Sequence, residues 1–198
     1  MAKRLFDLAV AALGLLLLAP LLVLLALAVR VDSPGPVLFR QERVGRHGVA
    51  FRIHKFRTMR VDAGASGPAV TVDRDPRVTR VGRWLRHYRL DELPQLVDVL
   101  RGRMSLVGPR PELPRFVAHY PAALRAAVLS VRPGITDPAT LAHIDEAALL
   151  ARSADPERDY IEKVLPPKLR LQAEYAARAT LRSDLGVLLR TLRVVFGR

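Results

Sequence analysis

The sequence predicts an α+β, mainly helical fold, in which an N-terminal apolar helix precedes a compact domain with short strands. Three observations predict it. The chain has 198 residues, which suits one compact domain rather than two. The 22 residues from Leu8 to Val29 carry no charge, and about 20 suffice to cross a bilayer as a helix. No later segment is apolar enough to do so, so we divide the chain into an anchor, residues 1–30, and a domain, residues 31–198.

Composition limits the partners of this domain. Lysine and arginine number 32 against 19 acidic residues, which leaves a net charge of +13 and a pI near 11.3. A chain this basic favours an anionic partner, such as nucleic acid, acidic phospholipid or a phosphorylated substrate. The absence of cysteine excludes disulfides, thiolate metal sites and a cysteine nucleophile. Aromatic residues make up only 6% of the chain and no base-stacking motif is present, which argues against nucleic acid.

The apolar run permits three interpretations. A cleaved signal peptide starts with basic residues, as Lys3 and Arg4 are here, but its apolar region is only about 7 to 15 residues long. The second interpretation is a helix that spans the membrane once. The third is a re-entrant helix broken by Pro20 near its middle, because a proline removes a helical hydrogen bond and bends the axis. Basic residues flank both ends of the run, so we favour the re-entrant form; a spanning helix with a tolerated kink is the alternative.

The region after the anchor is basic and rich in turn residues. The segments Val37–Phe39 and Phe51–Phe56 have the composition of short strands about a loop that contains glycine. Residues 62–73 have the composition of a surface loop. The excess of basic residues beside the anchor predicts a collar that is attracted to anionic phospholipid. Arginines recur at every third position between residues 74 and 89, a spacing that winds around a helix, so they cannot all face one ligand.

The adjacent acids Asp91 and Glu92 carry the most chemical information in the chain. Apolar residues at helical spacing follow them, and Pro94 is tolerated only within a first turn, so we expect a helix that begins at about Asp91. The positive end of such a helix favours an ionised carboxylate and attracts phosphate. One acid could then act as a nucleophile and the other as a Mg²⁺ ligand. The alternative is structural, with Asp91 as a helix cap and Glu92 as a complement to the helix dipole.

Two further motifs place an arginine at a rigid turn. Residues 102–112 begin like a buried strand and end in a loop where Arg110 stands between two prolines. A guanidinium fixed in this way loses little freedom when it binds a diphosphate through two hydrogen bonds. Arg132 precedes a Pro-Gly pair and repeats the arrangement. For Arg110 the alternative is an ion pair with an acid inside the domain.

The C-terminal residues 180–197 predict an amphipathic helix. Leucine and valine fill one side, while Arg182, Arg190 and Arg193 cluster on a helical projection. A basic amphipathic helix of this kind can lie in the membrane interface. The alternative is that its apolar side packs against the core of the domain.

Six motifs occur in this chain in a fixed order and cover nearly all of its length. They are Phe6-Asp7, Ser33-Pro34-Gly35-Pro36, Lys55 to Met59, Leu90 to Gln95, Met104 to Pro111 and Arg132 to Thr136. Taken together and in this order, they resemble the bacterial sugar transferases, the small monotopic polyprenyl-phosphate phosphoglycosyltransferases. Six motifs in register are far more specific than any one of them.

The resemblance implies a transferase that moves a phospho-sugar from a UDP-sugar to polyprenyl (undecaprenyl) phosphate and releases UMP. This would be the first membrane step of surface glycan assembly, as in exopolysaccharide biosynthesis. Asp91 would be the nucleophile that forms an aspartyl-phosphosugar intermediate, and Glu92, together with Asp91, would hold Mg²⁺. The residues expected to bind substrate phosphates are Lys55, Arg57, Thr58, Arg86, Arg110 and Arg132.

The resemblance also implies a location. The anchor would be a re-entrant helix in the bacterial inner (cytoplasmic) membrane, and the catalytic domain, residues 31–198, would face the cytoplasm. A homodimer is left open. Where the family has a Ser-Pro pair at the break, this chain has Ala19-Pro20, so the serine hydroxyl that could satisfy a freed backbone group is missing.

Three other positions depart from the family pattern. Asp98 stands where asparagine is usual, Arg103 where an acid is common, and Asp137 where glycine is usual. None of them replaces a proposed catalytic residue. Asp137 is the one that we expect to mark a subgroup with a different sugar preference.

A second class of function explains part of the same pattern. A non-catalytic, membrane-anchored scaffold that binds polyanions would account for the charge and the anchor. It would leave Asp91 and Glu92 without a reason to stand together in a basic domain. The enzyme is therefore the preferred hypothesis.

Overall fold

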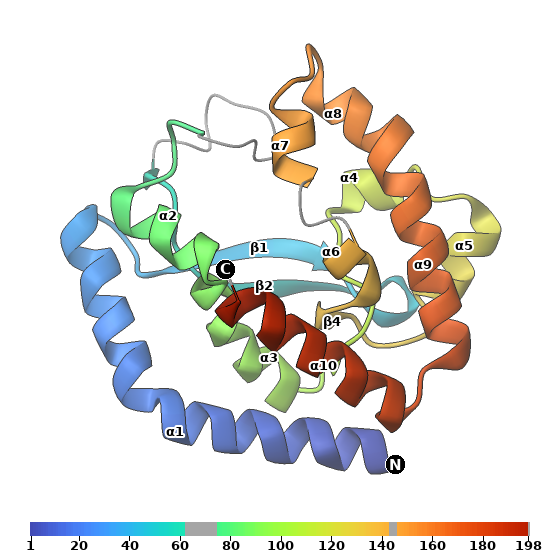
Figure 1. Cartoon of the computed structure of the whole chain (residues 1–198), viewed down its shortest axis with the longest axis horizontal. Coiled ribbons are helices and arrows are strands. Elements are labelled where there is room, and N and C mark those ends of the chain that lie inside the picture. Colours follow the sequence, from blue (N-terminus) through green and yellow to red (C-terminus); the bar gives the residue numbers. More distant parts are fainter. Residues whose placement is uncertain (62–74, 143–145, 198) are drawn as a thin grey trace.

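The computed structural model describes residues 1–61, 75–142 and 146–197, and the loop expected at residues 62–73 lies outside them. Within this part of the chain the fold is mainly helical, with two small two-stranded sheets. Helix α1 (Ala2–Asp32) runs along the outside of the domain, and the strands lie near the middle of the ribbon (Figure 1). The expectation of a mainly helical α+β fold with an N-terminal apolar helix is confirmed.

Helix α1 extends two residues beyond the expected anchor. Pro20 lies within it, and the ribbon bends part-way along its length (Figure 1), as proline-containing helices do. The helix is long and apolar enough to cross a membrane, yet only 11% of its most apolar stretch is buried by the protein. Large apolar side chains are exposed along much of it, unlike those of a helix in a soluble core. They include Leu13, Leu16, Leu17, Val23, Leu24 and Leu27.

An antiparallel hairpin follows the anchor. Strand β1 (Leu38–Val44) pairs with strand β2 (Ala50–Phe56), and the 3₁₀ turn η1 (Arg46–Gly48) connects them. The two expected strands are confirmed. β1 is longer than its expected segment, because the ladder continues through the polar residues 40–43, which composition alone does not mark as strand.

Helix α2 (Arg80–His87) packs closely on the end of this hairpin. Its N-cap is Thr79, whose Oγ1 accepts a hydrogen bond from the Gly82 backbone N–H at 2.9 Å. A Cβ on Gly82 would lie 2.2 Å from the Thr58 carbonyl oxygen. Glycine is therefore what lets the helix approach the backbone of residue 58.

A 3₁₀ turn, η3 (Leu90–Gln95), and a short helix, α3 (Leu96–Leu100), lead into the second sheet. That sheet pairs β3 (Ser105–Val107) in parallel with β4 (Gly134–Thr136). All three residues of β3 are buried, which confirms the expected buried strand. The two strands also lie very close beyond the ladder, since a Cβ on Gly134 would be 2.1 Å from the Gly108 nitrogen.

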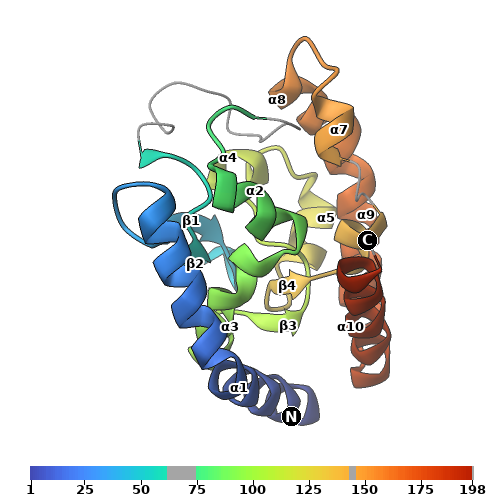
Figure 2. The ribbon, with the colours of Figure 1, turned by 60° about the vertical axis from the view of Figure 1, so that its left-hand side comes forward.

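Helical segments complete the domain. They are α4 (Pro114–Val117), α5 (Ala122–Val128), α6 (Pro138–Ala142), α7 (Glu146–Leu150), α8 (Pro156–Asp159), the π-helical turn η4 (Tyr160–Val164), α9 (Leu165–Arg178) and α10 (Leu181–Phe196). The expected C-terminal helix is confirmed as α10, which Thr180 caps. Figure 2 shows α9 and α10 together on one side of the domain.

The two halves of α1 pack on different parts of this domain. Ala11 is fully buried in a cluster that includes residues of β2, α3, β3 and α10. Leu25 and Val29 are buried in a second cluster, with Phe56 of β2 and Leu85 of α2. One face of the anchor is therefore continuous with the core of the domain.

Replacement of Gly134 by alanine should destabilise the domain by about 2 kcal/mol or more, because the new Cβ meets backbone atoms that have no room to move. Gly186 of α10 is the matched control: nothing lies within 4 Å of its Cβ position. Gly186→Ala should leave stability unchanged or raise it by about 0.5–1 kcal/mol, as glycine-to-alanine changes inside helices do. Thermal unfolding of the two purified variants measures the difference, and equal midpoints would contradict the close approach of the strands.

Candidate active site

Asp91 and Glu92 lie in the 3₁₀ turn η3, so the expected helix does begin at about Asp91, but its first six residues are 3₁₀ rather than α-helical. Arg89 adopts a left-handed conformation with φ 53° and separates the turn from α2. The Glu92 N–H donates to the Arg89 carbonyl oxygen, three residues back, at 3.2 Å. The α-helix starts only at Leu96 and has five residues. A helix this short and this far along the chain contributes little field at the acids, so side-chain charges determine the electrostatics of the site.

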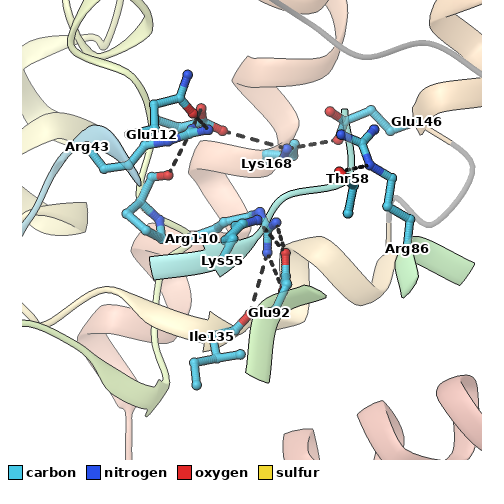
Figure 3. A network of polar contacts seen from close by, with 12 residues as sticks. Arg43, Lys55, Thr58, Arg86, Glu92, Arg110, Glu112, Ile135, Glu146 and Lys168 are labelled. Carbon is cyan, nitrogen blue, oxygen red and sulfur yellow. Dashed lines mark hydrogen bonds and ion pairs between the residues drawn. The ribbon is translucent and has the colours of Figure 1, made fainter. Parts of the chain in front are cut away.

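Both carboxylate oxygens of Glu92 are held by cations. Lys55 Nζ donates to Oε1 at 2.7 Å. Arg110 donates from its two terminal nitrogens, one to Oε2 at 3.2 Å and the other to Oε1. Figure 3 shows the two cationic side chains converging on Glu92. Burial acts to raise the pKa of Glu92, but the charges of Arg110 and Lys55 outweigh it and hold that pKa well below its ordinary value.

Asp91 is in a different state from its neighbour. Its side chain is 8% exposed, and within residues 1–61, 75–142 and 146–197 no side chain or backbone group donates a hydrogen bond to it. Burial raises the pKa of Asp91; the charge of Lys55 opposes this, and that of Glu92 adds to it. The pair therefore combines an ionised glutamate that two cations hold with an aspartate that accepts no hydrogen bond from the described residues.

Three separate segments of the chain build this cluster. Lys55 comes from β2 of the hairpin, Glu92 from η3, and Arg110 from the loop after β3. The Lys55 side chain is 17% exposed, and burial lowers its pKa while Glu92 raises it. The charge of Glu92 is the main reason that the pKa of Arg110 is raised. The arrangement places two fixed positive charges, the kind of group that binds a diphosphate, next to the Asp91 carboxylate.

Thr58 and Arg86 form a second polar pair near the acids. Arg86 Nε donates to Thr58 Oγ1 at 2.8 Å. Burial lowers the pKa of Arg86, and the nearby charge of Asp91 is the largest influence that raises it. Of the three-residue series, Arg86 therefore lies close enough to Asp91 for their charges to interact, while Arg77 pairs with Asp75. Figure 3 shows the terminal nitrogens of Arg86 turned away from the Glu92 cluster.

Arg57 and Arg132 are not brought to the acids by any contact in the described part of the chain. Arg57 is 5% exposed, and its guanidinium donates to the Ser33 carbonyl oxygen at 2.6 Å and to that of Pro34. It thus holds the turn that follows α1. Arg132 Nε donates to the Gly102 carbonyl oxygen at 2.9 Å, near Arg4. Their expected roles in phosphate binding remain predictions that these contacts do not support.

A buried polar network behind Arg110 was not expected from the sequence. Tyr160 donates to the Glu112 carboxylate at 2.5 Å, and the Glu112 carboxylate is also 3.5 Å from an Arg43 nitrogen. Lys168 pairs with Glu146 at 2.8 Å and lies 4.0 Å from Glu112 (Figure 3). The signal that could have found it is an acid two residues after Arg110 in a proline-stiffened loop.

Two of the three departures from the family pattern lie in buried contacts. Asp98 is fully buried, and its carboxylate accepts the His54 backbone N–H at 2.9 Å and contacts His54 Nδ1 at 2.8 Å. Asp137 is also fully buried and accepts three hydrogen bonds, one of them from Arg110. The Arg103 side chain makes no hydrogen bond or ion pair within the described residues, and nothing in the structure explains its identity.

The donor set fits Mg²⁺ that is bound together with substrate. No group of three or more histidine or acidic side chains that could enclose a metal occurs among the described residues. Asp91 and Glu92 provide two hard oxygen ligands, and Mg²⁺ typically uses one or two carboxylates, with substrate phosphates and waters completing its shell. Oε1 of Glu92 already accepts from both Lys55 and Arg110, whereas Oε2 accepts from Arg110 alone. Because a carboxylate oxygen has about two acceptor sites, Oε2 keeps one for a metal ion.

Comparison with known proteins gives three informative relatives. The chain is 51% identical over 140 residues to the undecaprenyl-phosphate glucose phosphotransferase of Komagataeibacter xylinus, covering 68% of this chain and 26% of that protein. It is 51% identical over 136 residues to the UDP-glucose:undecaprenyl-phosphate glucose-1-phosphate transferase of Caulobacter vibrioides, covering 68% and 51%. It is 43% identical over 118 residues to a putative undecaprenyl-phosphate N-acetylgalactosaminyl 1-phosphate transferase of Bacillus subtilis, covering 60% and 66%.

The match to these relatives is therefore partial, since less than two thirds of each is covered. The sequence profile of the bacterial sugar transferases, in contrast, matches residues 1–198, the whole chain. This match agrees with the motif order and with the convergence of Lys55, Glu92 and Arg110 on one site. The chain belongs to the bacterial sugar transferase family.

Proposed function

We propose that this chain transfers a sugar 1-phosphate from a UDP-sugar to a polyprenyl phosphate such as undecaprenyl phosphate, and releases UMP. The observation that carries the proposal is the Asp91 carboxylate, which accepts no hydrogen bond from the described residues and stands beside a glutamate that two cations hold. The family membership and the names of the relatives, which act on undecaprenyl phosphate, support the same reaction. A polyanion-binding scaffold would have no use for a buried acid to which no group in the described part of the chain donates.

The proposed reaction proceeds by two displacements. In the first, an Asp91 oxygen attacks the sugar-bearing phosphorus of the UDP-sugar, and the bond from this phosphorus to the oxygen of UMP breaks. The product is an aspartyl-phosphosugar ester and free UMP. In the second, an oxygen of the polyprenyl phosphate attacks the same phosphorus, and the Asp91 carboxylate leaves. The product is a polyprenyl-diphospho-sugar, and the enzyme returns to its starting state.

The neighbouring side chains assist in defined ways. Lys55 and Arg110 place positive charge where the negative charge of the transferring phosphoryl group develops. Glu92 keeps those two cations in place and, through its fixed negative charge, raises the pKa of Asp91 and makes it a stronger base. Glu92 and Asp91 would hold Mg²⁺, which when bound neutralises phosphate charge and polarises the phosphoryl oxygens.

Asp91→Asn should leave the protein folded and lower the rate of UMP release by about 10³-fold or more, because an amide is not a nucleophile. The assay combines the detergent-solubilised protein with polyprenyl phosphate, Mg²⁺ and a panel of UDP-sugars, and it also identifies the sugar. Chelation of the metal should abolish release by the wild type. Asp159→Asn, on the surface of α8, is the control that should stay active. An Asp91→Asn variant as active as that control would refute the nucleophile assignment.

The rate should fall in acid as Asp91 becomes protonated. Its pKa is raised by burial, so the acid limb of kcat/KM should lie above about pH 4, the region of an ordinary aspartate. Lys55 is the strongest influence that lowers this pKa, and Lys55→Met should move the limb to higher pH. Lys168→Met removes a buried ammonium that pairs with Glu146 instead, and should leave the limb in place. A limb at the same pH in wild type and Lys55→Met would contradict the assignment.

For the membrane helix we propose the re-entrant form, with both ends of α1 on the cytoplasmic side of the inner membrane. The N-terminal end is tied to the domain by buried polar contacts. Asp7 is 2% exposed and accepts from the Ser105 hydroxyl at 2.8 Å. Lys3 donates to the Val107 carbonyl oxygen at 3.1 Å and pairs with Asp184 of α10.

The C-terminal end of α1 is tied to the same domain. Asp32 accepts the Val81 backbone N–H of α2 at 2.9 Å, and Leu25 and Val29 are buried against Phe56 and Leu85. A straight 31-residue helix would be about 46 Å long at 1.5 Å per residue, more than a bilayer core of about 30 Å. A spanning helix would carry one of these ends across the membrane and away from the domain, so contacts at both ends favour entry and exit on one side.

The amphipathic helix α10 fits the same placement. One side is buried through Asp184 and Val187, while Leu185, Leu189 and Leu192 are exposed. The sequence allowed α10 either to pack on the core or to lie in the membrane interface. The structure is compatible with both, because one side of the helix packs on the core and the opposite side is exposed. We propose that the exposed leucines enter the membrane interface beside α1.

The chain contains no cysteine, so single introduced cysteines can be labelled without reaction of native residues and can test the topology. Ala2→Cys and Pro36→Cys lie at exposed positions on either side of the apolar run. A membrane-impermeant thiol reagent should label both from the cytoplasmic side, in inverted vesicles, and neither in intact spheroplasts. Ala19→Cys, within the run, should resist the reagent in both preparations. Labelling of residues 2 and 36 from opposite sides would establish a spanning helix.

A further inference from the structure

The fully buried carboxylate of Asp137 contacts the backbone of Arg110. It follows the last residue of β4. Its Oδ2 accepts the Arg110 backbone N–H at 3.2 Å and the Gln172 side-chain amide of α9 at 2.7 Å. Its Oδ1 accepts the Thr140 backbone N–H of α6 at 2.6 Å. One side chain thus connects the Arg110 loop to helices α6 and α9.

The rest of the loop is held by strand β4, but those bonds stop short of Arg110. The Gly108 N–H donates to the Thr136 carbonyl oxygen at 3.0 Å, and the Gly134 N–H donates to the Pro109 carbonyl oxygen at 3.0 Å. Pro111, the next residue, has no N–H to donate. Beyond Arg110 the loop is fixed through acceptors, since the Pro111 carbonyl oxygen accepts from Arg43 at 3.3 Å and the Glu112 carbonyl oxygen accepts the Val44 N–H at 2.9 Å. The bond from the Arg110 N–H to Asp137 therefore fixes Arg110 itself, between two anchored parts of the loop.

Arg110 is consequently held at both of its ends. Its backbone is bound by Asp137, and its guanidinium is bound by the two Glu92 oxygens, with a further contact of 3.5 Å to the Ile135 carbonyl oxygen. A bidentate pair of this kind depends on the direction of the planar guanidinium. A small shift of the backbone would change that direction and leave a buried charge poorly paired.

The choice of an acid at residue 137 is not explained by stability alone. A buried carboxylate that is bound only by neutral donors is costly to the folded state. The donors themselves could be satisfied by an uncharged acceptor. The nearest contacting residue that carries a charge is Arg110, and Asp137 contributes to the raised pKa of Arg110, after Glu92 and Glu112.

We propose that Asp137 is a positioning residue that determines where the Arg110 guanidinium meets Glu92, and through it where the diphosphate of the sugar donor is held. The proposal rests on the proposed function for its effect on rate. Its structural part, the orientation of Arg110, is independent of that function. Gln172 and Thr140 orient the Asp137 carboxylate and act one step further from the site.

A double-mutant cycle between Asp137→Asn and Arg110→Lys tests the proposal. The asparagine keeps the size of the side chain but has one oxygen for three donors. In the wild-type background, Asp137→Asn should lower kcat for UMP release by about 10-fold. In the Arg110→Lys background it should lower kcat by less than about 2-fold, because that variant has no guanidinium left to orient. The same fold-loss in both backgrounds would mean a merely structural role and would overturn the proposal.

A second readout does not depend on activity. The guanidinium NMR signal of Arg110, identified by its loss in Arg110→Lys, should report slow rotation in the wild type, because Glu92 holds both terminal nitrogens. In Asp137→Asn the rotation should become faster. Unchanged rotation would overturn the proposal even in an active enzyme. Absence of UMP release from the wild type with this restraint intact would reject only the proposed function.

Asp184→Asn is the matched control, because Asp184 is equally buried and binds Lys3 and Tyr175 away from Arg110. It should lower the unfolding temperature without changing the Arg110 signal. If Asp137→Asn fails to fold, Gln172→Leu replaces it in the cycle. This change removes the amide that orients Asp137 and leaves the acid in place, and it should show the same dependence on Arg110 with a smaller loss.

Discussion

The structure around the candidate site depends on one interaction, the capture of the Glu92 carboxylate by Lys55 and Arg110. It joins the β1–β2 hairpin, the η3 turn and the loop after β3, three segments that are distant in the chain. A buried charge is costly unless it is paired, and removal of one partner leaves the others uncompensated. Glu92 thus holds both cations, and the two cations together hold Glu92, while the adjacent Asp91 accepts no hydrogen bond from the described residues. The chemistry proposed for the site follows from this difference between neighbouring acids.

The same domain contacts α1 near both of its ends, and in the proposed topology this places the site beside the bilayer. Asp7 and Asp32, near the two ends of α1, accept hydrogen bonds from β3 and α2 respectively. The elements that carry these bonds are neighbours of the segments that carry Arg110 and Arg86. A lipid phosphate that stays at the membrane surface would then need to move only along that surface to meet the phosphosugar. The exposed leucines of α1 and α10 would define the depth at which this occurs.

Much of the local structure followed from the sequence, and the failures have physical causes. The apolar helix, the hairpin, the buried strand at residues 105–107 and the C-terminal helix were predicted correctly, because each has a pattern of apolar and turn residues within one segment. The helix expected at about Asp91 begins there, but as a 3₁₀ turn that follows the left-handed Arg89, and the spacing of apolar residues does not distinguish the two helix types over one or two turns. Arg57 has the same residue type as Arg110, but its location allows it to bind only the backbone of the turn after α1. Residue type and motif position do not distinguish a cation that faces a substrate from one that holds a carbonyl oxygen.

The sequence by itself determined the family, the presence of an apolar anchor and the identity of the paired acids, since these depend on the order and spacing of residues along one segment. Only the tertiary structure decided which basic residues face those acids, that two cations hold Glu92 while Asp91 accepts no hydrogen bond from the described residues, and that Asp137 contacts the backbone of Arg110. The physical reason is that ion pairs and burial join residues far apart in the chain. Lys55 and Arg110 are 55 positions apart, and it is the packing of the hairpin against η3 and the close approach of β3 and β4 that bring them to one carboxylate.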